Sequence, residues 1–136
     1  MPSVISVHKN VEIIRRGYQA FNLGDLKALG ELFDEKATWH SPGRSPLSGN
    51  FKGREAVFAH FGKLAEATGN TFQANLKHAF ADEEGRVVGM HHCTGQMAGR
   101  RLAVDCCIVF ELRNGRVTSG TEYVNDYPAW EAFWEA

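Results

Sequence analysis

Apolar residues in the first half of the chain recur at helical spacing. A first helix is predicted from about residue 8 to the stop at Asn22-Leu23-Gly24, with apolar positions Val11, Ile14, Tyr18 and Phe21. A second, shorter helix is predicted after the N-cap residue Asp25, with apolar positions Leu26, Leu29, Leu32 and Phe33. A third has Val57, Phe58, Phe61, Leu64 and Ala65 on one side.

From Thr71 onward the apolar period changes to two, which predicts strands. Turn signals at Glu83-Glu84-Gly85, Ala98-Gly99 and Arg113-Asn114-Gly115 divide this part into four long antiparallel strands. Helices followed by a run of strands indicate an α+β fold, with three helices covering one face of a curved sheet. We expect residues 1–136 to form a single domain, since chains of about 100–200 residues usually do.

Alternation along the strands predicts which side chains face the helices. The first long strand has Phe72, Ala74, Leu76, His78 and Phe80 on its inner face. A turn of two or four residues then places Val87, Gly89, His91 and Cys93 inward, whereas a three-residue turn replaces His91 by His92. We favour His91. The third strand has Leu102, Val104, Cys106, Ile108, Phe110 and Leu112 inward.

The faces of the last strand depend on one turn. A two-residue Asn114-Gly115 hairpin turns Val117 and Tyr123 inward and leaves Glu122 in solvent. A three-residue Arg113-Asn114-Gly115 loop, with Gly115 in the left-handed conformation, instead turns Glu122 and Asp126 inward. Composition slightly favours the first alternative, because Val117 and Tyr123 are the more apolar residues.

Composition excludes several classes of partner. The chain has 136 residues, 43% hydrophobic and 23% charged, and a formal net charge of -1, so it offers no basic field for nucleic acid. No apolar run is long enough to cross a membrane, and we expect a cytoplasmic protein. The three cysteines Cys93, Cys106 and Cys107 lack CxxC spacing, and we interpret them as buried small apolar residues.

Several motifs in order resemble the SnoaL-like branch of the nuclear transport factor 2 superfamily, which includes ketosteroid isomerases and polyketide cyclases. They are Phe21...Gly24-Asp25-Leu26, Ala37-Thr38-Trp39-His40-Ser41-Pro42-Gly43, Phe51-Lys52-Gly53-Arg54-Glu55, Val109-Phe110-Glu111-Leu112-Arg113-Asn114-Gly115 and Asp126-Tyr127-Pro128-Ala129-Trp130. The resemblance implies a cystatin-like cone, a sheet wrapped around three helices with an apolar cavity. It also implies a homodimer through the outer sheet face, where Ala103, Cys107 and Val109 form an apolar strip. The resemblance favours an inward Glu122, and we therefore predict the three-residue Arg113-Asn114-Gly115 loop.

The same resemblance limits the chemistry. The catalytic Asp residues of ketosteroid isomerases would fall near Ser41 and near Ile108 or Cys107, where this chain has no carboxylate. Steroid isomerase chemistry is therefore not supported. SnoaL-like cyclases move a proton next to a carbonyl, and Glu122, His91 and His78 are the acid/base groups available here, because burial moves such pKa values toward neutrality.

Other side chains are candidates to contact a ligand. We expect Ser45–Gly49 to form the rim of the cavity, and His60 to lie in solvent. Asp126 has a competing interpretation as the cap of a terminal helix that starts at Pro128. The candidate ligand-binding residues are Trp39, His40, Tyr18, Phe58, Phe61, Phe80, Ile108 and Asp126.

Two classes of function remain open at the level of sequence. The first is an isomerase, cyclase or hydrolase that acts on a small, largely apolar carbonyl compound, and the second is a carrier or sensor that only binds one. Two histidines and Glu122 could mimic a two-His, one-carboxylate metal site, but strands give no local ligand spacing to check. We therefore expect neither a metal nor a cofactor.

Overall fold

The computed structural model describes residues 4–135 and contains four helices and six strands. Their order along the chain is α1 (Val4–Leu23), α2 (Leu26–Leu32), β1 (Phe33–Ser41), β2 (Gly49–Lys52), α3 (Arg54–Ala67), β3 (Gln73–Ala81), β4 (Arg86–Met97), β5 (Arg100–Arg113), β6 (Arg116–Val124) and α4 (Tyr127–Trp134). Asp25 caps α2 by accepting a hydrogen bond from the backbone N–H of Ala28. The three predicted N-terminal helices and the four predicted long strands are all present.

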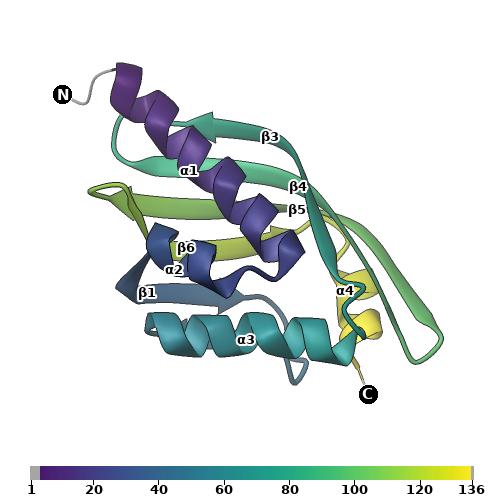
Figure 1. Ribbon diagram of the computed structural model, residues 1–136. Helices are drawn as coiled ribbons and strands as arrows, with labels where there is room; N and C mark the ends of the chain where they lie inside the picture. The colour runs from purple at the N-terminus through teal and green to yellow at the C-terminus, as the bar shows by residue number, and fades with distance from the viewer. Residues whose placement is uncertain (1–3, 136) are drawn as a thin grey trace.

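The six strands form one sheet in the order β2-β1-β6-β5-β4-β3. All neighbouring strands are antiparallel except β1 and β6, which pair in parallel. Figure 1 shows α1, α2 and α3 on the same face of the curved sheet, with α4 beside the end of the β4–β5 hairpin. The α+β cone predicted from the sequence is therefore confirmed, with β1 and β2 added at one edge.

Aromatic rings pack between α3 and the inner face of the sheet. The Trp39 ring of β1 meets the Phe61 ring of α3 edge to face, with 5.0 Å between centroids. The Phe33 ring also packs edge to face on Phe58 at 5.4 Å. Cys93, Cys106 and Ile108, on the inner faces of β4 and β5, are buried with these rings, as alternation predicted. This core fixes α3 and the centre of the sheet relative to each other.

A bulge in β3 contradicts two sequence-based placements. Leu76 pairs with His91 and His78 with Met90, so Lys77 is an extra residue in the ladder. Beyond it the two faces exchange, and His78 and Phe80, both predicted inward, are exposed on the outer face. Phe80 is 59% exposed.

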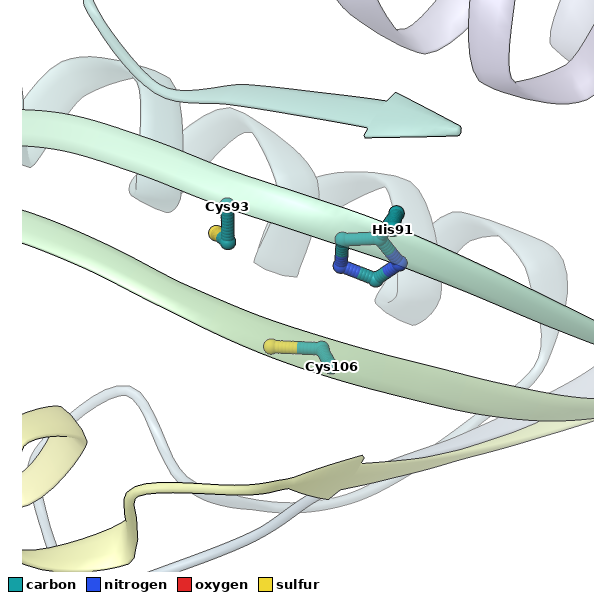
Figure 2. A group of neighbouring side chains, drawn as sticks. All are labelled: His91, Cys93 and Cys106. Atoms are coloured by element: carbon teal, nitrogen blue, oxygen red, sulfur yellow. The ribbon is translucent and has the colours of Figure 1, made fainter. Parts of the chain in front are cut away.

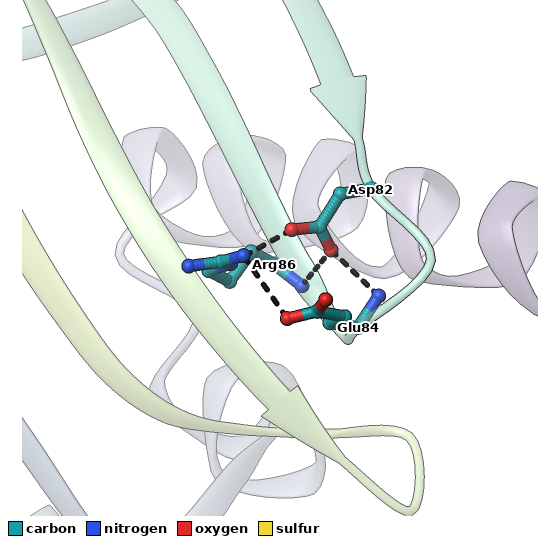
Figure 3. Close-up of polar contacts among 3 residues, drawn as sticks. All are labelled: Asp82, Glu84 and Arg86. Atoms are coloured by element: carbon teal, nitrogen blue, oxygen red, sulfur yellow. Dashed lines mark hydrogen bonds and ion pairs between the residues drawn. The ribbon is translucent and has the colours of Figure 1, made fainter.

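The turn between β3 and β4 has an odd number of residues between the paired residues Ala81 and Val87. Asp82 holds this turn, because its carboxylate accepts the backbone N–H groups of Glu84 and Arg86 and contacts the Arg86 guanidinium at 2.7 Å (Figure 3). An odd turn alone would bring His92 inward, but the bulge at Lys77 reverses the parity again. His91 is consequently buried at 3% exposure, which confirms its predicted inward placement.

The last strand combines both alternatives considered for it. Arg113 pairs with Arg116, so Asn114-Gly115 is a two-residue turn with both residues at positive φ, and the favoured three-residue loop is wrong. Val117 is therefore inward and buried. Leu112 pairs with Val117 but Glu111 with Ser119, which makes Thr118 a bulge residue. Past this bulge the faces exchange and Glu122 is inward, 8% exposed, as predicted.

Three further placements differ from expectation. The segment between β1 and β2 is tied to α4, because the Arg44 backbone N–H donates to the Glu131 carboxylate at 3.0 Å and the Trp130 indole donates to the Pro42 carbonyl oxygen. Asp126 is exposed and caps α4. His60, expected in solvent, is 2% exposed and stacks on Phe51 with 4.2 Å between ring centroids.

Candidate functional site

A largely apolar cavity lies between α1, α2 and the inner face of the sheet. The volume of the cavity is about 60 Å³. This is room for a few water molecules at roughly 10–15 Å³ each. Its walls include Ile13, Ile14, Phe21, Leu29, Leu32, Phe33, Trp39, Phe61, Leu64, Phe72, Ile108, Phe110 and Val117. The ionisable residues among those that line it are Tyr18, His91 and Glu122. The cavity therefore suits a compact apolar molecule with one polar end.

These three ionisable residues come from three elements and meet at one place in the wall. The Tyr18 hydroxyl of α1 lies 2.8 Å from Nδ1 of His91 on β4, within hydrogen-bond distance. On the other side of the imidazole, Nε2 lies 3.7 Å from Oε2 of Glu122 on β6. The His91 and Glu122 side chains are 1% and 9% exposed. A phenol, an imidazole and a carboxyl group thus lie in one polar row, in which the first two are hydrogen-bonded and the carboxyl lies just beyond hydrogen-bond distance.

Burial keeps all three groups in their neutral forms. It raises the pKa of Glu122 to about 8. It lowers the pKa of His91 to about 4, with nearby His92 acting in the same direction and Asp105 against it. Burial also raises the pKa of Tyr18 well above its ordinary value, and the Glu122 charge adds to this shift. At neutral pH the site therefore holds a protonated carboxyl beside an uncharged imidazole.

Two glycines leave room for the rings of this site. A Cβ atom at Gly89 of β4 would lie 2.8 Å from the Tyr18 hydroxyl oxygen, so the phenol reaches His91 only because residue 89 has no side chain. A Cβ atom at Gly120 of β6 would overlap the Trp39 ring. Both glycines face inward and pair with residues of β5, Ile108 and Phe110 respectively.

The structure brings together some of the predicted site residues and separates the others. Glu122, His91, Tyr18, Trp39, Phe61 and Ile108 all line the cavity. Neither His78 nor Phe80 does, because both are on the outer face. His40 lies 2.6 Å from Asn50 through Nδ1 and Oδ1, away from the cavity. Phe58 packs on Phe33 behind the cavity wall, and Asp126 caps α4. Ser45–Gly49, predicted to form the rim, contributes no lining residue.

A second group of side chains adjoins the same histidine. Donor atoms of His91, Cys93 and Cys106 all lie within 4.8 Å of one another, and the three residues are buried. Figure 2 shows the three side chains on the neighbouring strands β4 and β5. The hydrogen bond with Cys106, followed by burial, raises the pKa of the Cys93 thiol. The sequence placed both cysteines inward, but it gave no sign that they contact His91.

Sequence reasoning named Tyr18 only as a ligand-binding residue and missed its bond to His91. The bond joins residues 73 positions apart, and no local pattern reports such a distance. The available signal was Gly89, a small inward residue two positions before His91, opposite the helix that carries Tyr18. Among the residues that the structure describes, no helix has the length and apolar character needed to cross a membrane.

Comparison with known proteins identifies both the fold and the family of this chain. Solved structures with NTF2-like and ketosteroid isomerase-like folds superpose on this chain with TM-scores of 0.80 and 0.71. The protein-family model for the SnoaL-like domain matches residues 14–120 of this chain. The chain therefore belongs to the SnoaL-like family of the NTF2-like superfamily.

Relatives are found among both curated proteins and solved structures. An uncharacterised protein of Mycobacterium tuberculosis is 30% identical over 92% of this chain and 95% of its own length. Bal32a, from a soil-derived mobile gene cassette, is 53% identical, with a TM-score of 0.93 over 95% of this chain and 98% of its own. TerC, co-crystallised with polyporic acid, is similar in fold, with 18% identity and a TM-score of 0.81 over 94% of this chain and 99% of its own.

Proposed function

We propose that this protein binds a small, largely apolar carbonyl compound in its cavity and catalyses proton transfer next to the carbonyl, as an isomerase or cyclase. The observation that carries the proposal is the row Tyr18–His91–Glu122 in an otherwise apolar wall. The buried Tyr18 phenol can donate a hydrogen bond to a ligand carbonyl oxygen. The Glu122 carboxyl, with a pKa of about 8, is suited to acid/base catalysis near neutral pH.

The neutral forms set the hydrogen-bond directions that apply once a bound ligand draws Glu122 onto Nε2 of His91. When the protonated Glu122 donates toward Nε2 of His91, the imidazole proton lies on Nδ1 and is donated to the Tyr18 oxygen. The Tyr18 O–H is then free to point into the cavity. The row therefore presents one hydroxyl donor at the place where a carbonyl oxygen would bind.

The proposed reaction is a cyclic proton transfer. The carbonyl oxygen takes the Tyr18 proton, Tyr18 takes the Nδ1 proton, and Nε2 of His91 takes the Glu122 proton. The Glu122 carboxylate removes the proton from the carbon beside the carbonyl. The C–H electron pair becomes the C=C bond of the enol, and the carbonyl π pair forms its O–H bond. The reverse transfer to a different carbon completes an isomerisation and restores the original tautomer.

A carrier without catalysis is the second candidate, and one distance favours it. The separation of 3.7 Å between Nε2 of His91 and Oε2 of Glu122 exceeds hydrogen-bond distance. Without ligand, the proton path is therefore interrupted between these two atoms. Catalysis requires the bound ligand to draw these atoms together, as often happens when a substrate binds. A carrier requires no such movement.

The comparisons support a small molecule as partner. TerC, which was co-crystallised with polyporic acid, has the same fold. At 18% identity this similarity shows the fold and not the ligand. The cavity of this chain is apolar and small, which favours a compact ligand over an extended one.

We further propose that the protein forms a homodimer through the outer sheet face. In the register of the sheet, Met90 lies opposite Cys107, and Cys107 lies opposite Tyr123. Met90 is 43% and Tyr123 54% exposed, and together with half-buried Val109 they make an apolar strip across three strands. A second copy of the same strip would remove this surface from water.

The test of catalysis uses cyclohexenone as a compact apolar probe in heavy water. Proton NMR follows the exchange of the proton beside the carbonyl. The wild-type protein should accelerate exchange over buffer by about 100-fold or more. Glu122→Gln should return the rate to that of buffer, whereas Glu111→Gln, at an exposed position of β5, should retain it. Binding of cyclohexenone in native mass spectrometry without acceleration would contradict catalysis and leave the carrier.

A further inference from the structure

The group of His91, Cys93 and Cys106 has the composition of a metal site. His91 and Cys93 are two positions apart on β4 and therefore share a face, while Cys106 of β5 lies directly opposite His91. Their donor atoms lie within 4.8 Å of one another. Two sulfur ligands at about 2.3 Å and one imidazole nitrogen at about 2.0–2.1 Å from a zinc ion lie less than 4.8 Å apart, so a small contraction would close the site.

One nitrogen of His91 is already assigned by its neighbours. Nδ1 lies 2.8 Å from the Tyr18 hydroxyl, which leaves Nε2 as the ligand atom. A metal-bound imidazole usually donates its second N–H to an oxygen acceptor, and this bond fixes the orientation of the ring. The Tyr18 oxygen is in the place of that acceptor. The ring of His91 is thus oriented before any ion binds.

Charge and ligand type select the kind of ion. Two thiolates and a neutral imidazole compensate a divalent cation fully, so the occupied site carries no net charge and is compatible with its apolar surroundings. The two thiol protons go to solvent when the metal binds. Sulfur and imidazole ligands favour zinc and similar thiophilic ions over magnesium or calcium. The side of Nε2 toward Glu122 remains available for a fourth ligand.

We propose that His91, Cys93 and Cys106 bind one thiophilic divalent cation, of the zinc class, in the cavity wall. A cation on Nε2 of His91 uses the lone pair that the proposed proton path needs, so the occupied site excludes that path in the same molecule. The site is tested independently of catalysis, because its occupancy is read from metal–sulfur bonding and not from turnover. It also distinguishes the two inward cysteines from Cys107, which lies on the outer face beside them.

The test is a titration of the reduced, chelator-treated protein with Co²⁺, followed by displacement with Zn²⁺. The expected result is one cobalt per chain, with thiolate-to-cobalt charge-transfer absorption and the intense visible bands of a tetrahedral site. Cys93→Ala and Cys106→Ala should each lose the charge-transfer absorption and bind zinc more than about 100-fold more weakly. Cys107→Ala is the matched control and should behave as wild type.

X-ray absorption of the zinc-loaded wild-type protein gives the same answer if a cysteine variant does not fold. The proposal expects two sulfur atoms and at least one nitrogen around zinc. A cobalt spectrum without thiolate absorption, a zinc shell of oxygen and nitrogen only, or loss of the absorption in Cys107→Ala would overturn it.

Discussion

The Tyr18 hydroxyl lies 2.8 Å from Nδ1 of His91, and it reaches that position over a residue without a side chain, Gly89. The bond links α1 to the centre of the sheet and fixes the imidazole that separates Tyr18 from Glu122. Both the proposed proton path and the proposed metal site use the other nitrogen of this ring. Both the proposed proton path and the proposed metal site therefore require the packing of α1 on β4.

Gly89→Ala should break this bond. The new Cβ would lie 2.8 Å from the Tyr18 hydroxyl oxygen and 3.0 Å from a ring carbon, so the phenol has to move and a buried imidazole nitrogen loses its partner. We expect the free energy of unfolding to fall by about 1–3 kcal/mol. Nitrogen NMR of His91 should report the loss of the Nδ1 hydrogen bond.

Gly95→Ala is the control for this variant. Gly95 is also buried on β4, but its added Cβ would contact Phe72 and Thr68 at an ordinary 3.6 Å. We expect its His91 spectrum to match that of the wild type. The same unchanged spectrum in Gly89→Ala would contradict the steric argument.

Stability should fall as the pH rises from 6.5 to 8. In this range the unfolded chain has an ionised Glu122, with an ordinary pKa of 4.5, whereas the folded protein keeps it protonated up to a pKa of about 8. The unfolded state then binds fewer protons, so the free energy of unfolding decreases with pH. The expected loss is about 2 kcal/mol, from roughly 1.4 kcal/mol per pH unit.

Two histidines set the lower limit of that range. Burial lowers the pKa values of His91 and His60 from 6.5 to about 4, so below pH 6.5 both make stability rise with pH and oppose Glu122. Urea unfolding of the metal-free protein at pH 6.5, 7 and 8 measures the effect. Glu122→Gln should remove most of the slope. A slope that is equally steep in this variant would assign it to other groups.

Met90→Glu should disrupt the proposed dimer. The substitution places a charge in the middle of the apolar strip, opposite Cys107, where a partner copy would have to bury it. Light scattering at micromolar concentration should give twice the chain mass for the wild type and one chain mass for the variant. Gln96→Glu, which is exposed near the end of the same strand, should remain dimeric. A monomeric wild type would refute the interface.

The layers of the fold could be predicted from periodicity, but the site depends on interruptions of periodicity. Alternation placed His91, Cys93, Cys106 and Ile108 inward, and all four are buried. The same rule failed for His78 and Phe80, because a bulge at Lys77 exchanges the faces of β3. A bulge is one extra residue in a strand, and no particular residue type marks its position. It is recognised only when the pairing of both strands is known.

Glu122 shows how a correct placement can follow from a wrong turn. The three-residue loop predicted for residues 113–115 and the observed bulge at Thr118 each shift the pairing register of β6 by one residue, so both bring Glu122 inward. Only the bulge also leaves Val117 buried opposite Leu112. Val117 and Glu122 are an odd number of positions apart, so a strand without a bulge cannot turn both inward.

Titration of Glu122 shows directly whether a buried, protonated carboxyl group lies beside His91 in the cavity. Infrared difference spectra of metal-free wild type against Glu122→Gln isolate the carbonyl stretch of this one protonated carboxyl group. We expect the band to persist at neutral pH and to be half lost near the pKa of about 8. A band already lost at a midpoint near the ordinary value of 4.5 would show an ionised, solvated Glu122 and would contradict this expectation.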